Sequence, residues 1–187
     1  KMGVYKLQDF TRMNIALLDF AKQLQSNNDS TEYSNVGGWQ SAKDIYSLDD
    51  TDILKPFILS TVKDYLKSMD CIKPFTMSAM WINICPQYSY HCRHNHENSA
   101  ISGVYYVRVP KDSGKLKLIN SISKPDSQSI TPQHILFTPE EGDLVLFDSQ
   151  IEHEVTQNNS KHDRVSIAFN ILFNKPMRPE GPQHRSG

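Results

Sequence analysis

The sequence predicts a mostly β fold, an antiparallel sandwich or barrel with α-helices packed outside it. Three observations support this prediction. Helical periodicity is confined to the chain before about residue 70, while short runs rich in β-branched and aromatic residues fill the chain from Phe75 onward. Turn-forming stretches such as KDSG and PEEG separate these runs. Many short strands with little helix between them are typical of sandwiches and barrels.

The first expected helix runs from Thr11 to Gln25, with Thr11 able to cap its N-terminus. Apolar residues recur in it at helical spacing, namely Met13, Leu17, Phe20 and Leu24. The polar stretch that follows, 27–44, predicts a loop with two glycines before Trp39. This tryptophan either packs on the surface of the core or borders a ligand site.

A second helix is expected to start near Asp50 or Thr51 and to reach Met69, with Pro56 acceptable only near its first turn. Its apolar side comprises Ile53, Phe57, Val62, Tyr65 and Leu66. Six strands are expected after it, at 76–85, 100–110, 114–121, 134–139, 142–149 and 164–174.

The chain has 187 residues, which is long enough for one domain with a full core. We expect a single domain over 1–187, with a helical N-terminal support (1–70), a β core (71–175) and a loosely ordered tail (176–187). A net charge of -1 provides no electrostatic footprint for nucleic acid, and no apolar run is long enough to span a membrane. Three cysteines without CxxC spacing favour a reducing, cytoplasmic location and a metal held by imidazole and carboxylate rather than by sulfur.

The segment YHCRHNHENS concentrates three of the seven histidines in six positions, His91, His94 and His96. His153 follows a strand run 59 positions after His94, which is far enough for a rolled-up sheet to bring the two together. If they converge, they form one face of a metal site whose other face is open, as catalytic sites require. We expect His91 to be peripheral.

Arg164 opens the last strand run, and Ser166 points to the same face two residues later. A buried arginine is costly unless it is paired, so an inward-pointing Arg164 predicts a bound anion. A planar guanidinium suits a carboxylate bound by two parallel hydrogen bonds.

These motifs resemble, in residue type and in order, those of the 2-oxoglutarate- and Fe(II)-dependent dioxygenases. The stretch PEEGDLVLFDSQIEHEV is similar to a P-x-x-G-x-L-x-x-F-x-S…H-x-V segment of that superfamily. With SNVGGWQS, WINI, HNHENSAISGVYYVRVP and RVSIAFN, it resembles a small group of phage and marine-bacterial oxygenases. The resemblance covers about Ser34 to Phe173 and implies a double-stranded β-helix (a cupin-like jelly roll) with the N-terminal helices outside.

The resemblance also implies roles for single residues. His94 and His153 would ligate Fe(II), and Arg164, assisted by Ser166, would bind the distal carboxylate of 2-oxoglutarate. Tyr106 matches a tyrosine that binds that carboxylate in prolyl-hydroxylase relatives, and Asn83 matches an asparagine that binds the cosubstrate in the DNA-repair demethylase branch. For both residues the alternative is an ordinary packed strand residue.

The sequence departs from the family pattern where an acidic second ligand is usual, because His96 stands there. Three possibilities follow: His96 ligates and completes a three-histidine site, Glu97 swings in, or water or halide fills the position. We favour His96, since alternation along a strand puts positions 94 and 96 on one face. Protons would then compete with the metal below about pH 6.5, the ordinary pKa of histidine.

The expected function is hydroxylation of a small-molecule or peptide substrate with Fe(II), 2-oxoglutarate and O2, releasing succinate and CO2. Two alternatives remain: a cupin-type three-histidine dioxygenase that does not use 2-oxoglutarate, and a non-catalytic β-sandwich that binds a ligand. Neither the substrate nor the oligomeric state follows from the residues, because specificity resides in loops.

Overall fold

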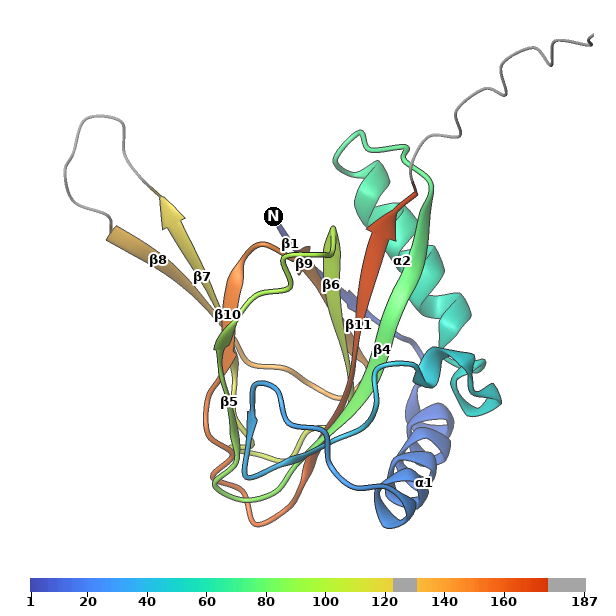
Figure 1. The fold of residues 1–187 in the computed structure, drawn as a ribbon, viewed down its shortest axis with the longest axis vertical. Coiled ribbons are helices and arrows are strands. Elements are labelled where there is room, and N and C mark those ends of the chain that lie inside the picture. Colours follow the sequence, from blue (N-terminus) through green and yellow to red (C-terminus); the bar gives the residue numbers. More distant parts are fainter. Residues whose placement is uncertain (123–130, 175–187) are drawn as a thin grey trace, which may run out of the picture.

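The computed structural model describes residues 1–122 and 131–174, which form two antiparallel sheets (Figure 1). The expected tail, 176–187, lies outside the described residues. The six-stranded sheet has the order β1-β9-β6-β11-β4-β3 and the five-stranded sheet the order β2-β5-β10-β7-β8. The strands are β1 (Met2–Lys6), β2 (Asn35–Val36), β3 (Trp39–Gln40), β4 (Phe75–Cys85), β5 (Tyr90–His94), β6 (Ile101–Arg108), β7 (Leu116–Ile122), β8 (Thr131–Phe137), β9 (Asp143–Asp148), β10 (Glu152–Val155) and β11 (Arg164–Phe173).

Helices α1 (Thr11–Asn27) and α2 (Lys55–Lys67) cover the outer face of the six-stranded sheet (Figure 1). The expected arrangement, a β core with helices outside, is therefore confirmed. Alternation along β4 separates two environments: Met80, Ile82 and Ile84 join the core beneath the helices, whereas Trp81 and Asn83 point to the inner face. No helix in the described part of the chain is both long and apolar enough to cross a membrane.

The N-terminal 70 residues contain three short strands in addition to the two predicted helices. β1 pairs with β9 along the edge of the six-stranded sheet, and β2 and β3 lie within the expected loop. The second helix begins at Lys55 because Pro56 fits only its first turn, and a short 3-10 helix, η2 (Asp49–Thr51), precedes it. Phe10, not Thr11, occupies the cap position of α1, and Ile53 is exposed rather than buried.

Two short strands that carry histidines, β5 and β10, pair in the five-stranded sheet. His94 lies opposite His153, and His91 lies opposite Val155, so three steps along β5 match two along β10. This bulge places two β5 residues opposite one on β10 and reverses the alternation between them. As a result, both His91 and His94 face the space between the sheets, although their odd spacing predicts opposite faces.

Candidate metal centre and cosubstrate pocket

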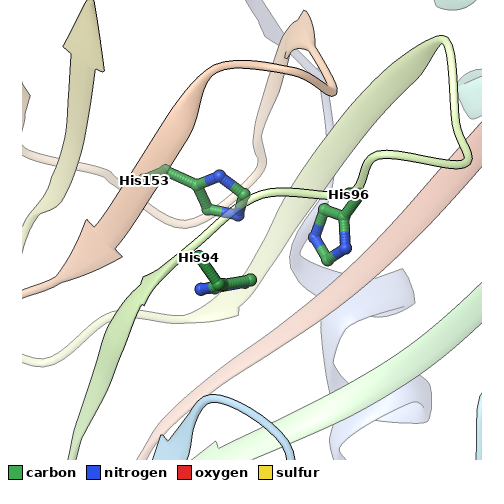
Figure 2. Close-up of side chains that lie close together, drawn as sticks. All are labelled: His94, His96 and His153. Atoms are coloured by element: carbon green, nitrogen blue, oxygen red, sulfur yellow. The ribbon is translucent and has the colours of Figure 1, made fainter.

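Three histidines converge in the space between the sheets (Figure 2). One nitrogen from each of His94, His96 and His153 lies within 4.8 Å of the other two. The ring centroids of His94 and His153 are 4.2 Å apart. The ring centroid of His96 lies 5.1 Å from that of His94 and 5.2 Å from that of His153. The paired strands β5 and β10 thus bring together the two histidines that are 59 positions apart in sequence, and His96 joins them from the adjoining loop.

Backbone carbonyl groups orient two of these rings. The Nδ1–H of His94 donates to the carbonyl oxygen of Cys92 at 2.8 Å, and that of His153 donates to the carbonyl oxygen of Ile151 at 3.0 Å. Because Nδ1 carries the proton, Nε2 of each ring keeps its lone pair for a metal. Such outer hydrogen bonds are the usual means of fixing a ligating histidine.

His96 reaches the cluster from the loop that follows β5, not from a strand. Its backbone N–H donates to the carbonyl oxygen of Ser149 at 2.9 Å, and its ring packs edge-on against Trp81 at 5.6 Å. Gln150 donates to the carbonyl oxygen of Glu97 at 3.0 Å, while the Glu97 side chain is exposed and does not border the cavity. The loop therefore presents His96, and not Glu97, to the other two histidines.

Burial keeps all three imidazoles neutral, which is the form that binds a metal. It lowers the pKa of His96 to about 3 and that of His153 to about 4, and it lowers the pKa of His94 as well. Mutual repulsion between the rings acts in the same direction on His96 and His153. Because burial lowers these pKa values, we expect protons to compete with the metal at a lower pH than the ordinary histidine pKa of about 6.5.

Three of the expected cosubstrate residues, Asn83, Ser166 and Tyr106, lie in one row across the six-stranded sheet, and Gln40 extends this row to a fourth strand. Ser166 on β11 lies opposite Asn83 on β4 and opposite Tyr106 on β6, and Asn83 lies opposite Gln40 on β3. Residues directly opposite each other share a face, so the four side chains border the same cavity. Nothing in the sequence identifies Gln40 as a pocket residue. Its neighbour Trp39 was considered as a residue that could border a ligand site, but Trp39 packs in the core.

Arg164 is buried beside this row, with 3% of its surface exposed. It donates to the carbonyl oxygen of Ser113 at 3.1 Å and contacts the Cys85 sulfur at 3.4 Å. Among the described residues, neither the Arg164 Nε nor the side-chain nitrogen of Gln40 has a hydrogen-bond partner. Gly114 is required nearby, because its φ is +97° and a side chain there would meet Arg164 and the Thr156 carbonyl oxygen.

His91 belongs to the pocket wall rather than to the periphery, contrary to expectation. Its ring nitrogens contact the Ser34 hydroxyl at 3.2 Å and the Cys85 sulfur at 3.3 Å. Cys85 in turn contacts Arg164, so His91 supports the arginine through the thiol. The β5 bulge explains the error, since a sequence pattern does not reveal where a strand changes its alternation.

The histidines and Arg164 border one cavity of about 400 Å³. The residues fit Fe(II) and 2-oxoglutarate by their chemistry. Three neutral imidazoles are suitable iron ligands. Two buried, unpartnered donors, Arg164 Nε and Gln40 Nε2, suit an anion with several acceptor oxygens, such as a carboxylate.

Comparisons with known proteins agree with this chemistry. The family model described as "Putative 2OG-Fe(II) oxygenase" matches residues 79–170, the region from β4 to β11 that contains the three histidines and Arg164. No curated protein matches the chain in sequence.

Solved structures share the fold. A prolyl-4-hydroxylase from Pseudomonas putida superimposes with a TM-score of 0.66 at 15% identity, over 93% of each chain. HygX from Streptomyces hygroscopicus, solved with nickel and 2-oxoglutarate bound, gives 0.66 at 11% identity, over 99% of this chain and 89% of that one. A prolyl hydroxylase from Trichoplax adhaerens, solved with a hypoxia-inducible-factor peptide, gives 0.64 at 15% identity, over 92% and 83%. At such identities the likeness establishes the double-stranded β-helix fold.

A cluster of three histidines and a buried arginine thus border one cavity inside a double-stranded β-helix, an arrangement that suits a non-haem metal-dependent oxygenase. The family model covers residues 79–170, just under half of the chain, and together with the fold it indicates an enzyme of the 2OG-Fe(II) oxygenase type, which uses Fe(II), 2-oxoglutarate and O2.

Proposed function

We propose that this chain hydroxylates a small-molecule or peptide substrate with Fe(II) held by His94, His96 and His153 and with 2-oxoglutarate anchored by Arg164. One observation carries the proposal. The converging imidazole nitrogens and the buried donors that lack partners border the same cavity. Fe(II) with 2-oxoglutarate supplies the oxidation when bound: one oxygen atom of O2 enters a C–H bond of the substrate, and the other enters succinate as CO2 leaves.

The protein prepares the metal site in advance. The proton on Nδ1 of His94 and of His153 is committed to a backbone carbonyl, so neither ring has to change tautomer when the metal arrives. Burial keeps the rings neutral over the physiological pH range. Three neutral ligands leave the site one unit more positive than a site with one carboxylate, which favours anionic ligands at the open positions.

His96 is the preferred third ligand over Glu97 and over water or halide. Its ring faces the other two, whereas the Glu97 carboxylate is exposed to solvent. The hydrogen bond from the His96 N–H to Ser149 fixes the backbone at this point. Turning Glu97 inward would require breaking this bond and the Gln150 contact.

Arg164 binds the distal carboxylate of 2-oxoglutarate in this proposal, with Gln40 and Ser166 beside it. Arg164 has an unpartnered N–H, and it lies in a buried site where a charge-assisted hydrogen bond is strong. Tyr106 and Asn83 lie on either side of Ser166 in the row, where they would border the cosubstrate.

The direct test measures the binding of 2-oxoglutarate to the Mn(II)-loaded protein by calorimetry. We expect binding that depends on the metal, because the keto and carboxylate oxygens at one end chelate it. Glutarate is the matched control, since it keeps the distal carboxylate but lacks the keto oxygen, and it is expected to bind at least tenfold more weakly. A protein that binds Mn(II) but not 2-oxoglutarate would instead support the cupin-type alternative.

A further inference from the structure

The cavity has an excess of positive charge. Among the described residues that border it are three cations, Lys43, Arg93 and Arg164, and none is aspartate or glutamate. The two carboxylates of bound 2-oxoglutarate would neutralise Arg164 and part of the charge of the metal. Arg93 is half exposed and already paired, at 3.6 Å, with Glu154. Lys43 is left without a counter-charge.

The backbone of Lys43 is attached to β4, and its side chain borders the cavity. Its carbonyl oxygen accepts a hydrogen bond from the N–H of Met80 at 2.9 Å, and the next residue, Asp44, forms a bridge with the same strand. Its ammonium nitrogen lies 3.5 Å from the centroid of the Tyr33 ring and 5.3 Å from that of Trp81. No carboxylate in the described part of the chain lies within salt-bridge distance of it.

Two aromatic rings contact the Lys43 ammonium group, whereas Lys6, Lys55 and Lys117 pair with carboxylates. Ring faces attract a cation without neutralising it, and they accept few of its three N–H donors. Lys43 is only partly exposed to water, and this burial lowers the pKa of its ammonium group. A partly dry cation with free donors attracts an anion strongly.

We propose that Lys43 binds an anionic group of the substrate, so that the enzyme acts on small organic acids that carry a carboxylate or a phosphate. Trp81 links this subsite to the reaction centre, because its ring packs against both the Lys43 ammonium and the His96 ring. A substrate anchored at Lys43 therefore extends along Trp81 toward the histidines. The claim that the bound anion is a substrate rests on the proposed function. The anion site itself depends only on Lys43 and the rings of Tyr33 and Trp81.

The test uses three aromatic probes that differ in charge: phenylacetate, phenyl phosphate and the neutral phenylacetamide. Their ring-proton relaxation is followed by NMR with the protein loaded with Mn(II) and the 2-oxoglutarate analogue N-oxalylglycine. We expect at least one anionic probe to bind about tenfold or more tightly than the amide, the effect of one charge-assisted hydrogen bond. Its relaxation should be enhanced by the nearby Mn(II).

Lys43→Gln should weaken the anionic probe about tenfold and leave the amide unchanged. Lys73→Gln is the matched control, because its ammonium also lies over an aromatic ring, 5.3 Å from the Phe173 centroid, but outside this cavity. Tyr33→Leu keeps the charge and removes one ring. It should retain most of the binding, whereas a merely structural Lys43–Tyr33 contact predicts equal losses in Tyr33→Leu and Lys43→Gln.

Equal binding of all three probes, or anion binding unchanged in Lys43→Gln, would overturn the proposal. So would a loss of N-oxalylglycine binding in Lys43→Gln, because it would assign Lys43 to the cosubstrate. A wild-type protein that binds neither Mn(II) nor N-oxalylglycine would refute the proposed function instead. In that case, probe line broadening in the metal-free protein still decides whether Lys43 holds an anion.

Discussion

Replacing Arg164 with methionine should weaken 2-oxoglutarate binding and, at the same time, leave the ligand-free protein as stable as before or more stable. Arg164 is 3% exposed, and its guanidinium has no carboxylate partner in the described part of the chain. Its desolvation is compensated only by a carbonyl oxygen and a thiol, with Nε unpartnered. A buried charge without a counter-ion destabilises the fold, so an apolar side chain of similar length should relieve that cost.

The expected loss of affinity follows from the contacts that Arg164 would make. A hydrogen bond to a charged group contributes about 1.5–3 kcal/mol, and the loss of one corresponds to roughly a tenfold to hundredfold weaker Kd. Calorimetry on the Mn(II)-loaded variant gives this value, and thermal unfolding of the metal-free variant gives the stability. Arg164→Lys is the matched control: it keeps the charge but loses the fork of donors, and it should bind with intermediate affinity.

The opposite pattern would refute the assignment. If Arg164→Met binds 2-oxoglutarate as the wild type does but unfolds several degrees lower, the arginine is a structural residue that ties Ser113 to Cys85. Manganese binding should be unaffected in either case, since Arg164 lies outside the histidine cluster.

Further outcomes concern the histidines. His153→Ala should abolish the single high-affinity Mn(II) site measured by calorimetry, because the cluster loses one of three ligands; undiminished binding would exclude this residue. His96→Ala should weaken Mn(II) binding by tenfold or more, Glu97→Ala should not, and the reverse result would make the acid the ligand. For His91, burial and then the charge of Arg164 lower the pKa to about 3, so the unfolded chain takes up a proton between about pH 6.5 and 3 that the folded chain does not. Stability is thus lost as pH falls, by about 2 kcal/mol at pH 5 for this group, and the metal-free His91→Asn variant should show a correspondingly smaller loss between pH 7 and pH 5 in denaturant titrations.

The β core was predictable because its strands carry strong local signals. β4, β6, β9 and β11 are long, rich in β-branched and aromatic residues, and bounded by turn formers, and all were expected near their observed bounds. The short strand β1 was missed because five residues are too few to reveal that they will pair with β9. Its partner is about 140 positions away, and such pairing is decided by the tertiary fold.

The sequence predicted those site residues whose side-chain chemistry is distinctive, but not those that reach the pocket only through strand register or a bulge. His94, His96, His153 and Arg164 have side chains that are rarely placed together without a function, and the fold brings the histidines to one point. Gln40 and His91 entered the pocket for reasons that no local pattern contains. The first depends on the register between β3 and β4, and the second on the bulge in β5.

The central claim is that three histidines hold the metal while Arg164 holds the distal carboxylate of 2-oxoglutarate. A crystal structure of the protein with Mn(II) and N-oxalylglycine tests both parts in one measurement. We expect metal bonds from His94, His96 and His153, two oxygens of the analogue on the metal, and its distal carboxylate on Arg164. A metal bonded to Glu97 in place of His96, or a distal carboxylate that lies on Lys43 instead of Arg164, would contradict the claim.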